Sequence, residues 1–314
     1  MIVIGAVLVA ALMMPRSAVH AQKPILLRYK MEPNKPLIYK MTTNTKQVQT
    51  VRNMKIETVM SNTEISIRTL KGFDKSKNLE LQTENKLLNV KVKIGPLGEY
   101  KYDSKSDENE RGSTLGAALT PLYDTLNGAY ETIVMSPRGE IVETKGFAEL
   151  VASALKDNPL GKQFAGNGTN TARKFSLAEF FPVLSKAPVK PGDTWEEPYE
   201  IELPKLGKAK GTRKFKFVGY EMVGKTKTAK ITYTTEMTFD IDLNIGGQKI
   251  TGKMTMEKSA GTVNFDPQKG QLVKLKSGFT MGGDINVSVN GMDIPIGTKQ
   301  TQTITLERLT KLPE

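Results

Sequence analysis

The stretch ITYTTEMTFDIDLNI, residues Ile231–Ile245, decides the fold. Its odd-numbered positions are apolar except Thr235, and its even-numbered positions are polar throughout. A period of two is typical of a β-strand with one buried face. The run is far longer than the usual strand of about five or six residues. The sequence therefore predicts a long strand in a sheet with one apolar face.

Two turn signals extend this strand into an antiparallel sheet. Gly246-Gly247 follows it directly, and Asn290-Gly291 occurs later; both are dipeptides of two-residue hairpins. Counting outward from each turn places apolar residues opposite one another on one face, which fixes the register. The predicted pairs are Leu243 with Ile250, Ile241 with Gly252, Phe239 with Met254, Met237 with Met256, Val289 with Met292, Val287 with Ile294, and Ile285 with Ile296.

Further strands are predicted on both sides of a helical middle. They are Leu37–Val51, Met54–Leu70, Asn78–Ile94, Glu99–Tyr102, Tyr130–Met135, Ile141–Thr144, Trp195–Leu203, Lys214–Val223, Gly261–Phe265, Gln271–Phe279 and Thr298–Arg308. The apolar phase changes within Met54–Leu70, and we expect a β-bulge there. The fold class is α+β and β-dominated: a long curved antiparallel sheet, an open or half barrel, with a helical insert.

The insert contains three helical patterns. Ser113–Asn127 has leucines at helical spacing, and Pro121 is expected to start a second short helix. Phe147–Leu155 follows the i, i+3, i+4, i+7 template. Ser176-Leu177-Ala178-Glu179 reads as a capping box that opens a helix. Asp157–Lys174 is rich in Gly and Asn, and we expect this connection to be mobile.

We expect a signal peptide over residues 1–21, cleaved after Ala21, because the 13-residue apolar run Ile2–Met14 precedes a break and a small-residue site. The run is too short to span a bilayer. The rest divides into an N-terminal β part (22–112), the insert with a short hairpin (113–189) and a C-terminal β part (190–314). We expect these to form one composite domain in the periplasm or outside the cell.

Composition removes whole classes of mechanism. The chain has no Cys, and its single His, His20, falls in the expected signal peptide. The mature protein then has no thiol nucleophile, no thiolate or imidazole metal ligand and no Ser–His–Asp triad. Ser153-Ala-Leu-Lys156 matches the S-x-x-K pattern but lacks its companion motifs. We therefore expect no enzyme, no catalytic residue, no metal and no cofactor.

A methionine-rich apolar face is the candidate ligand site. Methionine is flexible and polarisable, and it lines promiscuous apolar surfaces. If the curved sheet leaves a hollow, this face would hold a lipid or other apolar or amphiphilic ligand; otherwise the helices fill it as a dry core. The candidate residues are Met237, Phe239, Ile241, Met254, Met256, Val287 and Met292.

A basic segment is the second candidate site. The chain has a formal net charge of +12, and part of it is concentrated in one short region: Lys205, Lys208, Lys210, Arg213, Lys214 and Lys216. Such a cluster can contact an anionic polymer of the cell envelope, or can simply be a solvated edge strand, where Lys discourages aggregation. Lysine outnumbers arginine and base readout favours arginine, so we expect no nucleic-acid partner.

Four segments together resemble a known family: Leu37–Met41, Met135-Ser-Pro-Arg-Gly-Glu-Ile141, Lys190-Pro-Gly-Asp-Thr-Trp195 and Phe265–Val273. They are similar to an uncharacterised family of secreted bacterial β-rich proteins, a domain of unknown function. The resemblance implies an envelope or secreted location and supplies no catalytic residues. A looser, fold-level likeness is to periplasmic lipoprotein carriers, in which a curved sheet wraps helices.

Overall fold

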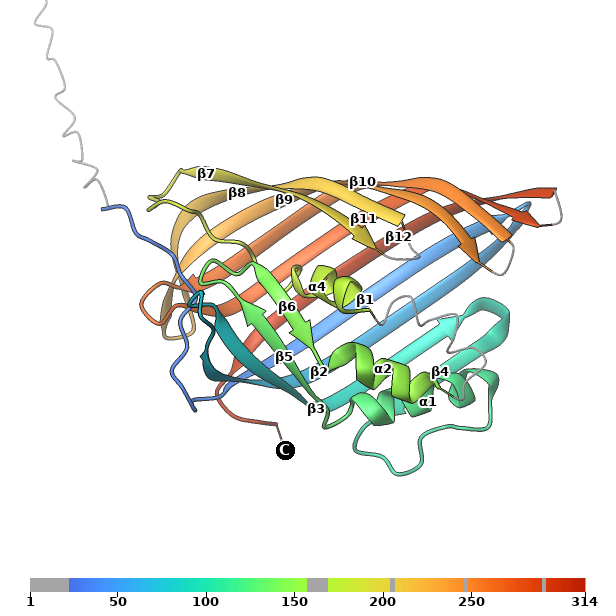
Figure 1. The fold of residues 1–314 in the computed structure, drawn as a ribbon, viewed down its shortest axis with the longest axis horizontal. Coiled ribbons are helices and arrows are strands. Elements are labelled where there is room, and N and C mark those ends of the chain that lie inside the picture. Colours follow the sequence, from blue (N-terminus) through green and yellow to red (C-terminus); the bar gives the residue numbers. More distant parts are fainter. Residues whose placement is uncertain (1–22, 157–168, 204–206, 246–247, 290–291, 314) are drawn as a thin grey trace, which may run out of the picture.

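Strands dominate the computed structural model, which describes residues 23–156, 169–203, 207–245, 248–289 and 292–313 (Figure 1). The strands are β1 (Leu37–Val51), β2 (Met54–Phe73), β3 (Leu79–Ile94), β4 (Gly98–Asp103), β5 (Tyr130–Met135), β6 (Ile141–Lys145), β7 (Thr194–Leu203), β8 (Gly207–Val223), β9 (Thr226–Ile245), β10 (Gln248–Asp266), β11 (Gln271–Val289) and β12 (Met292–Leu309). The helices are α1 (Thr114–Leu126), α2 (Phe147–Leu155) and α4 (Asn170–Leu177), with a 3-10 turn at Gly95–Leu97.

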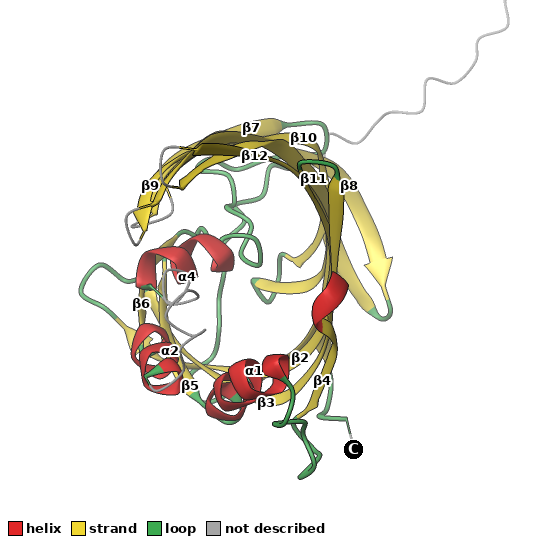
Figure 2. Ribbon diagram, turned by 90° about the vertical axis from the view of Figure 1, so that its right-hand side faces the viewer, coloured by secondary structure: helices red, strands yellow, loops and turns green. Residues whose placement is uncertain are grey.

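All these strands join one antiparallel sheet in the order β6-β5-β3-β2-β1-β12-β11-β10-β9-β8-β7, with β4 paired to β3. The pairing of β1 with β12 joins the N-terminal and C-terminal strands. The sheet curls into an incomplete ring whose edges, β6 and β7, do not pair, and α4 contacts both of them (Figure 2). The predicted long, open, curved sheet with a helical insert is confirmed.

The hairpin registers are confirmed with one exception. Both predicted turns, 246–247 and 290–291, lie outside the described residues, but the strands flanking them pair as counted. The pairing of Met237 with Met256 is wrong. A register shift between Thr255 and Gly261 breaks the β9–β10 ladder there, so Met256 has no partner in β9; on the other side of β10 it lies opposite Met281 of β11.

The β-bulge expected within Met54–Leu70 is found in the ladder of β2 with β3, although not in its ladder with β1. Pairing of β2 with β1 is regular from Arg68 to Met54, so β2 has no bulge against β1. A register shift against β3 between Ile65 and Ser66 leaves Lys86 of β3 without a partner. The inward positions of β2 carry polar residues, including Glu64, and this polar inner wall produced the change of phase.

Two expectations about the helices are wrong. Pro121 lies inside α1, which continues to Leu126, and starts no second helix. Ser176 lies in the last turn of α4. The helix begins instead at Thr169, whose side chain accepts a hydrogen bond from the Ala172 amide at 3.1 Å.

The expected mobile connection overlaps this helix, since residues 170–174 belong to α4. Residues 157–168 lie outside the described part of the chain. The prediction of a helix at Phe147–Leu155 is confirmed as α2.

Two apolar clusters hold the sheet and helices together. The larger lies inside the curl and includes Phe217, Phe265 and Leu306. The smaller packs α1, through Leu115, against Val90 and Tyr100 of β3 and β4. Both clusters use the alternate inward positions that the period-two pattern marks as apolar.

Candidate functional site

The curled sheet and the helices enclose a cavity of about 460 Å³. Its walls come from β1, β2 and β3 on one side and from β9 to β12 on the other, with α1, α2 and α4 contributing side chains. The interior of the sheet is therefore not completely filled by the helices. Five methionines line it: Met41, Met60, Met237, Met256 and Met281.

The wall formed by β9, β10 and β11 is apolar. Met237, Met256, Phe279 and Met281 come together there. The pairing of Met256 with Met281 places two of these side chains next to each other across adjacent strands. Flexible thioether side chains adapt to differently shaped apolar ligands, which makes this wall tolerant of the ligand's shape.

The opposite wall is mixed, with polar side chains among Met41, Met60 and Leu88. Asn62 and Glu64 occupy successive inward positions of β2, and Asn85 follows on β3. Arg173 and Ser176 of α4 complete this end of the cavity. The Asn62 side-chain oxygen is buried and has no hydrogen-bond partner. A buried polar atom without a partner costs free energy, so this end offers hydrogen bonding that the protein itself leaves unused.

Arg173 is held by a carboxylate behind it. Its Nε donates to Glu131 at 2.8 Å, and its Nη2 forms an ion pair with the same carboxylate. The guanidinium also lies 4.5 Å from the ring centre of Phe147 in α2. Since Glu131 comes from β5, this two-bonded contact fixes α4 to the sheet and aims Arg173 at the cavity.

Glu64 is a titratable group that faces the cavity and has no ion-pair partner in the described part of the chain. Burial raises the pKa of its carboxyl above the usual value, the nearby charge of Arg173 lowers it, and Glu131 raises it further. The carboxyl is therefore more easily protonated than an exposed one. No salt bridge to Glu64 is present among the described residues.

A second buried cation lies further along β2. Arg68 is 6% exposed, and its guanidinium lies between the rings of Tyr39 and Phe181, at 4.6 Å and 4.5 Å from their centres. Its Nε has no hydrogen-bond partner. Its charge acts on Glu64, lowering the pKa of that carboxyl.

The segment just after α4, which lines the cavity, is bound to β8. Arg213 donates to the Ala178 carbonyl at 2.7 Å and forms an ion pair with Glu179, just after α4. Glu179 itself lines the cavity. This buried ion pair therefore links the end of α4 to the C-terminal part of the sheet.

The predicted ligand residues are only partly brought to the cavity. Met237 and Met256 line it. Phe239, Ile241, Met254 and Val287 lie farther along the same strands, and Met292 is 62% exposed at the start of β12. The face prediction missed Met41, Phe279 and Met281, although all three lie in predicted strands or their extensions and share the same alternation.

The predicted basic segment divides between the two faces of β8. Lys208, Lys210, Lys214 and Lys216 occupy exposed positions, and Lys205 lies outside the described residues. The placement of Arg213 with them is wrong, because the period of two turns it inward to Glu179. The strand is also not an edge: β7 lies outside it.

Acidic residues of the neighbouring strands offset part of this charge. Lys208 pairs with Glu200 of β7 at 2.6 Å, and Lys214 with Glu236 of β9 at 2.6 Å. The same face has a broad hollow of about 830 Å³, lined by Lys214, Lys216 and Lys276 together with Thr194, Thr232, Thr234, Thr262, Thr303 and Thr305. The outer face is therefore basic and only partly compensated around β8.

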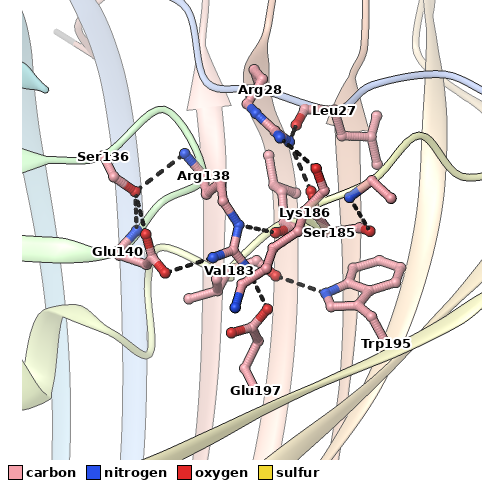
Figure 3. Close-up of polar contacts among 12 residues, drawn as sticks. Leu27, Arg28, Ser136, Arg138, Glu140, Val183, Ser185, Lys186, Trp195 and Glu197 are labelled. Carbon is pink, nitrogen blue, oxygen red and sulfur yellow. Dashed lines mark hydrogen bonds and ion pairs between the residues drawn. The ribbon is translucent and has the colours of Figure 1, made fainter. Parts of the chain in front are cut away.

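The segment that connects α4 to β7 is anchored by long polar side chains (Figure 3). Arg138 donates from Nε to the Leu184 carbonyl at 2.9 Å and forms ion pairs with Glu140 and Glu197. Arg28 donates to the Ser185 carbonyl at 2.7 Å and to that of Lys186 at 2.8 Å, and Trp195 donates to Val183 at 3.0 Å.

Three of the four sequence motifs meet at this anchor. Arg138 lies in the motif 135–141 and Trp195 in the motif 190–195. In the motif 265–273, the Gly270 carbonyl accepts a hydrogen bond from the Lys30 amide at 2.8 Å. The motifs therefore mark a structural closure of this end of the sheet.

The sequence comparison identifies a family at this point. Residues 74–272 match the family described as "Family of unknown function (DUF6263)". The chain belongs to this family. The match runs from the end of β2 to the start of β11 and includes the helices, Arg173 and Glu131. No curated protein matches the chain in sequence.

Solved structures show only distant likeness. Lipovitellin, in a structure concerned with its lipid–protein interactions, is 11% identical with a TM-score of 0.42; the match covers 91% of this chain and 26% of that one, about a quarter of its length. The β domain of the Bordetella autotransporter BrkA is 8% identical with a TM-score of 0.24, covering 88% and 99%. A putative exported protein with a YmcC-like fold from Bacteroides fragilis is 11% identical with a TM-score of 0.22, covering 91% and 99%. Such distant likenesses carry no functional argument.

None of the helices in the described ranges has the length and apolar character that a membrane crossing needs.

Proposed function

We propose that this protein is a non-enzymatic binding protein of the cell envelope or of the secreted space, and that it holds one amphiphilic molecule in the cavity under α4. The observation that supports this most directly is the two-sided lining. Met237, Met256, Met281 and Phe279 form an apolar wall, and Asn62, Glu64 and Arg173 place polar groups on the other side, among Met60 and Leu88. An amphiphile needs both kinds of wall, whereas a dry core needs only the first.

The size of the cavity limits the ligand. Small-molecule sites range over about 300–1,000 Å³, and this cavity of about 460 Å³ falls inside that range. At about 30 Å³ for each liquid water, it has room for about 15 groups of that size, and a methylene group is similar. One acyl chain with a small head group fits this volume.

The location rests on the apolar run before Ala21, which has the form of a signal peptide. These residues lie outside the described part of the chain. The absence of Cys, and of His outside that segment, supports a binding role over a catalytic one.

Native mass spectrometry of protein purified from its own host tests the proposal. The wild type is expected to show a bound mass that organic extraction removes, and the extracted protein is expected to take up a fluorescent single-chain amphiphile. Met281→Trp fills part of the cavity and should abolish uptake. Met292→Trp is the matched control, because Met292 is 62% exposed and does not line the cavity.

Each contrary outcome has a clear meaning. A wild-type protein without bound mass and without amphiphile uptake rejects the proposed function. Equal uptake by Met281→Trp and Met292→Trp rejects this cavity as the site.

The hollow on the outer face favours a second candidate, contact with an anionic envelope polymer. Lys216 and Lys276 line it, and neither forms a salt bridge within the described residues. Polymer binding should weaken steeply with salt. It should be lost in a double Lys216→Glu and Lys276→Glu variant and kept in Lys299→Glu. Unchanged binding by the double variant rejects this candidate.

A further inference from the structure

The charges at the polar end of the cavity do not balance when Glu64 is protonated. Arg173 and Glu131 cancel each other in a two-bonded pair, and Glu179 of the lining is cancelled by Arg213. This leaves Arg68 and Glu64, which do not form a salt bridge with each other. An arginine keeps its proton in a protein. A neutral Glu64 therefore leaves one buried positive charge without compensation.

The interior favours such a neutral Glu64. Its carboxyl faces a cavity instead of bulk water, and Glu131 lies near it on the other side of Arg173. The charged groups that act on it are Arg173 of α4, Glu131 of β5 and Arg68 of β2. Burial outweighs the two arginines and raises the pKa of the Glu64 carboxyl.

Unused hydrogen-bonding groups surround the same point. Two nitrogens of Arg173 bind Glu131, and its Nη1 has no hydrogen bond in the described structure. The buried Asn62 amide has an oxygen without a partner, and a half-turn of this amide would present its nitrogen instead. Ser176 adds a hydroxyl to the lining. These groups can donate to an anion.

We infer that the ligand is a single-chain amphiphile with a carboxylate head, that the head lies between Glu64 and Arg173, and that its chain lies along Met237, Met256 and Met281. Glu64 in its protonated form donates a hydrogen bond to the carboxylate, and the carboxylate supplies the negative charge that Glu64 no longer carries. Binding is therefore accompanied by uptake of a proton from solvent when Glu64 starts ionised. This inference rests on the proposed function and specifies its ligand.

Other head groups fit less well. An ammonium head would add a positive charge beside Arg173 and Arg68. A hydroxyl head would use the hydrogen bonds but leave the charge of Arg68 uncompensated. In the low-dielectric interior, charge imbalance is more costly than in water.

Three probes with the same twelve-carbon chain test the head group: dodecanoate, dodecanol and dodecylamine, each titrated calorimetrically into delipidated wild type. We expect dodecanoate to bind at least about tenfold more tightly than the other two probes. One hydrogen bond to a charged group increases affinity by about this factor or more. The affinity for dodecanoate should fall as pH rises, since the proton on Glu64 is then lost, whereas dodecanol should show no such fall.

Glu64→Gln imitates the protonated carboxyl and should bind dodecanoate with an affinity independent of pH. Glu57→Gln is the matched control on the same strand, because Glu57 is exposed and pairs with Lys46. It should keep the wild-type pH dependence. Circular dichroism shows whether each variant folds, and the ratio of dodecanoate to dodecanol affinity in the wild type tests the inference without any variant.

The outcomes separate the two claims. Failure of all three probes to bind rejects the proposed function itself. Tight binding of dodecanol or dodecylamine, equal to that of dodecanoate, keeps the function and overturns the carboxylate head. A pH dependence that persists in Glu64→Gln overturns the role of Glu64.

Discussion

Glu179→Gln is expected to destabilise the protein by about 3 kcal/mol, because loss of one partner from a buried ion pair typically costs about 3–5 kcal/mol. The Arg213 side chain is 8% exposed and that of Glu179 is 22% exposed. The lower end of the range applies, since Glu179 faces the cavity and its replacement keeps a hydrogen-bond acceptor. Arg213 also retains its bond to the Ala178 carbonyl.

The next residue in the chain provides the control. Lys214 points outward and pairs with Glu236 at 2.6 Å, with side chains 44% and 69% exposed. An exposed pair of this kind contributes about 0–1 kcal/mol. Glu236→Gln should therefore change the free energy of unfolding by less than about 1 kcal/mol, although it removes a contact of the same chemical type.

Urea denaturation of both variants measures the difference, with tryptophan fluorescence of Trp195 as the signal. A double variant, Glu179→Met with Arg213→Met, should recover most of the loss, because no buried charge is then left alone. Similar small losses for Glu179→Gln and Glu236→Gln would refute the reasoning. They would mean that water reaches Arg213 and that burial does not decide the energy of this pair.

Three further outcomes can be checked by unfolding experiments. Gly252→Ala should cost about 1–3 kcal/mol, because its new Cβ would lie 2.4 Å from a backbone oxygen of β11, whereas Gly278→Ala, with 3.5 Å to its nearest neighbour, should be nearly neutral; equal urea midpoints would contradict this. The pKa of the Glu64 carboxyl is raised in the folded protein. Ionisation of Glu64 therefore does not reduce stability below the pKa of the unfolded state, and the loss of stability grows as pH rises through the pKa of the folded state. Wild type should therefore lose stability relative to Glu64→Gln from about pH 4.5 upward, and parallel curves would exclude the effect. Arg68→Lys should lower stability by about 2 kcal/mol, because an ammonium cannot stack between two rings at 4.6 Å and 4.5 Å as a planar guanidinium does, and an unchanged melting temperature would argue against the stacking.

The apolar wall of the cavity could be predicted from sequence because alternation and turn chemistry act locally. The hairpin count places Met237 on the inner face of the sheet, and the structure agrees. It also puts Met256 on that face, but against the wrong partner. The register shift in the β9–β10 ladder depends on the packing of β10 against both of its neighbours, β9 and β11. Counting residues outward from one turn does not take the second neighbour into account.

The polar wall could not be predicted in this way. Asn62 and Glu64 face the cavity, whereas Ile65 and Ile67 take the alternate positions. A rule that places apolar residues inside therefore assigns this part of β2 the wrong phase. The contact of Arg173 with Glu131 joins residues 42 positions apart, and no local sequence pattern predicts it. The inward position of Arg213 could have been predicted from the sequence, because Arg213 alternates with the outward Lys214 and shares its phase with Phe215 and Phe217.

The neighbouring positions of β1 and β12 have a consequence for biogenesis. These are the first and last long strands of the chain, and Ile38 pairs with Leu309. The amide of Lys30 likewise cannot form its hydrogen bond until the carbonyl of Gly270 has been synthesised. A chain made or exported from its N-terminus cannot join the two halves of the sheet until its last strand has emerged. Its apolar inner face is exposed until then, so the nascent protein depends on protection from aggregation longer than a protein of local contacts would.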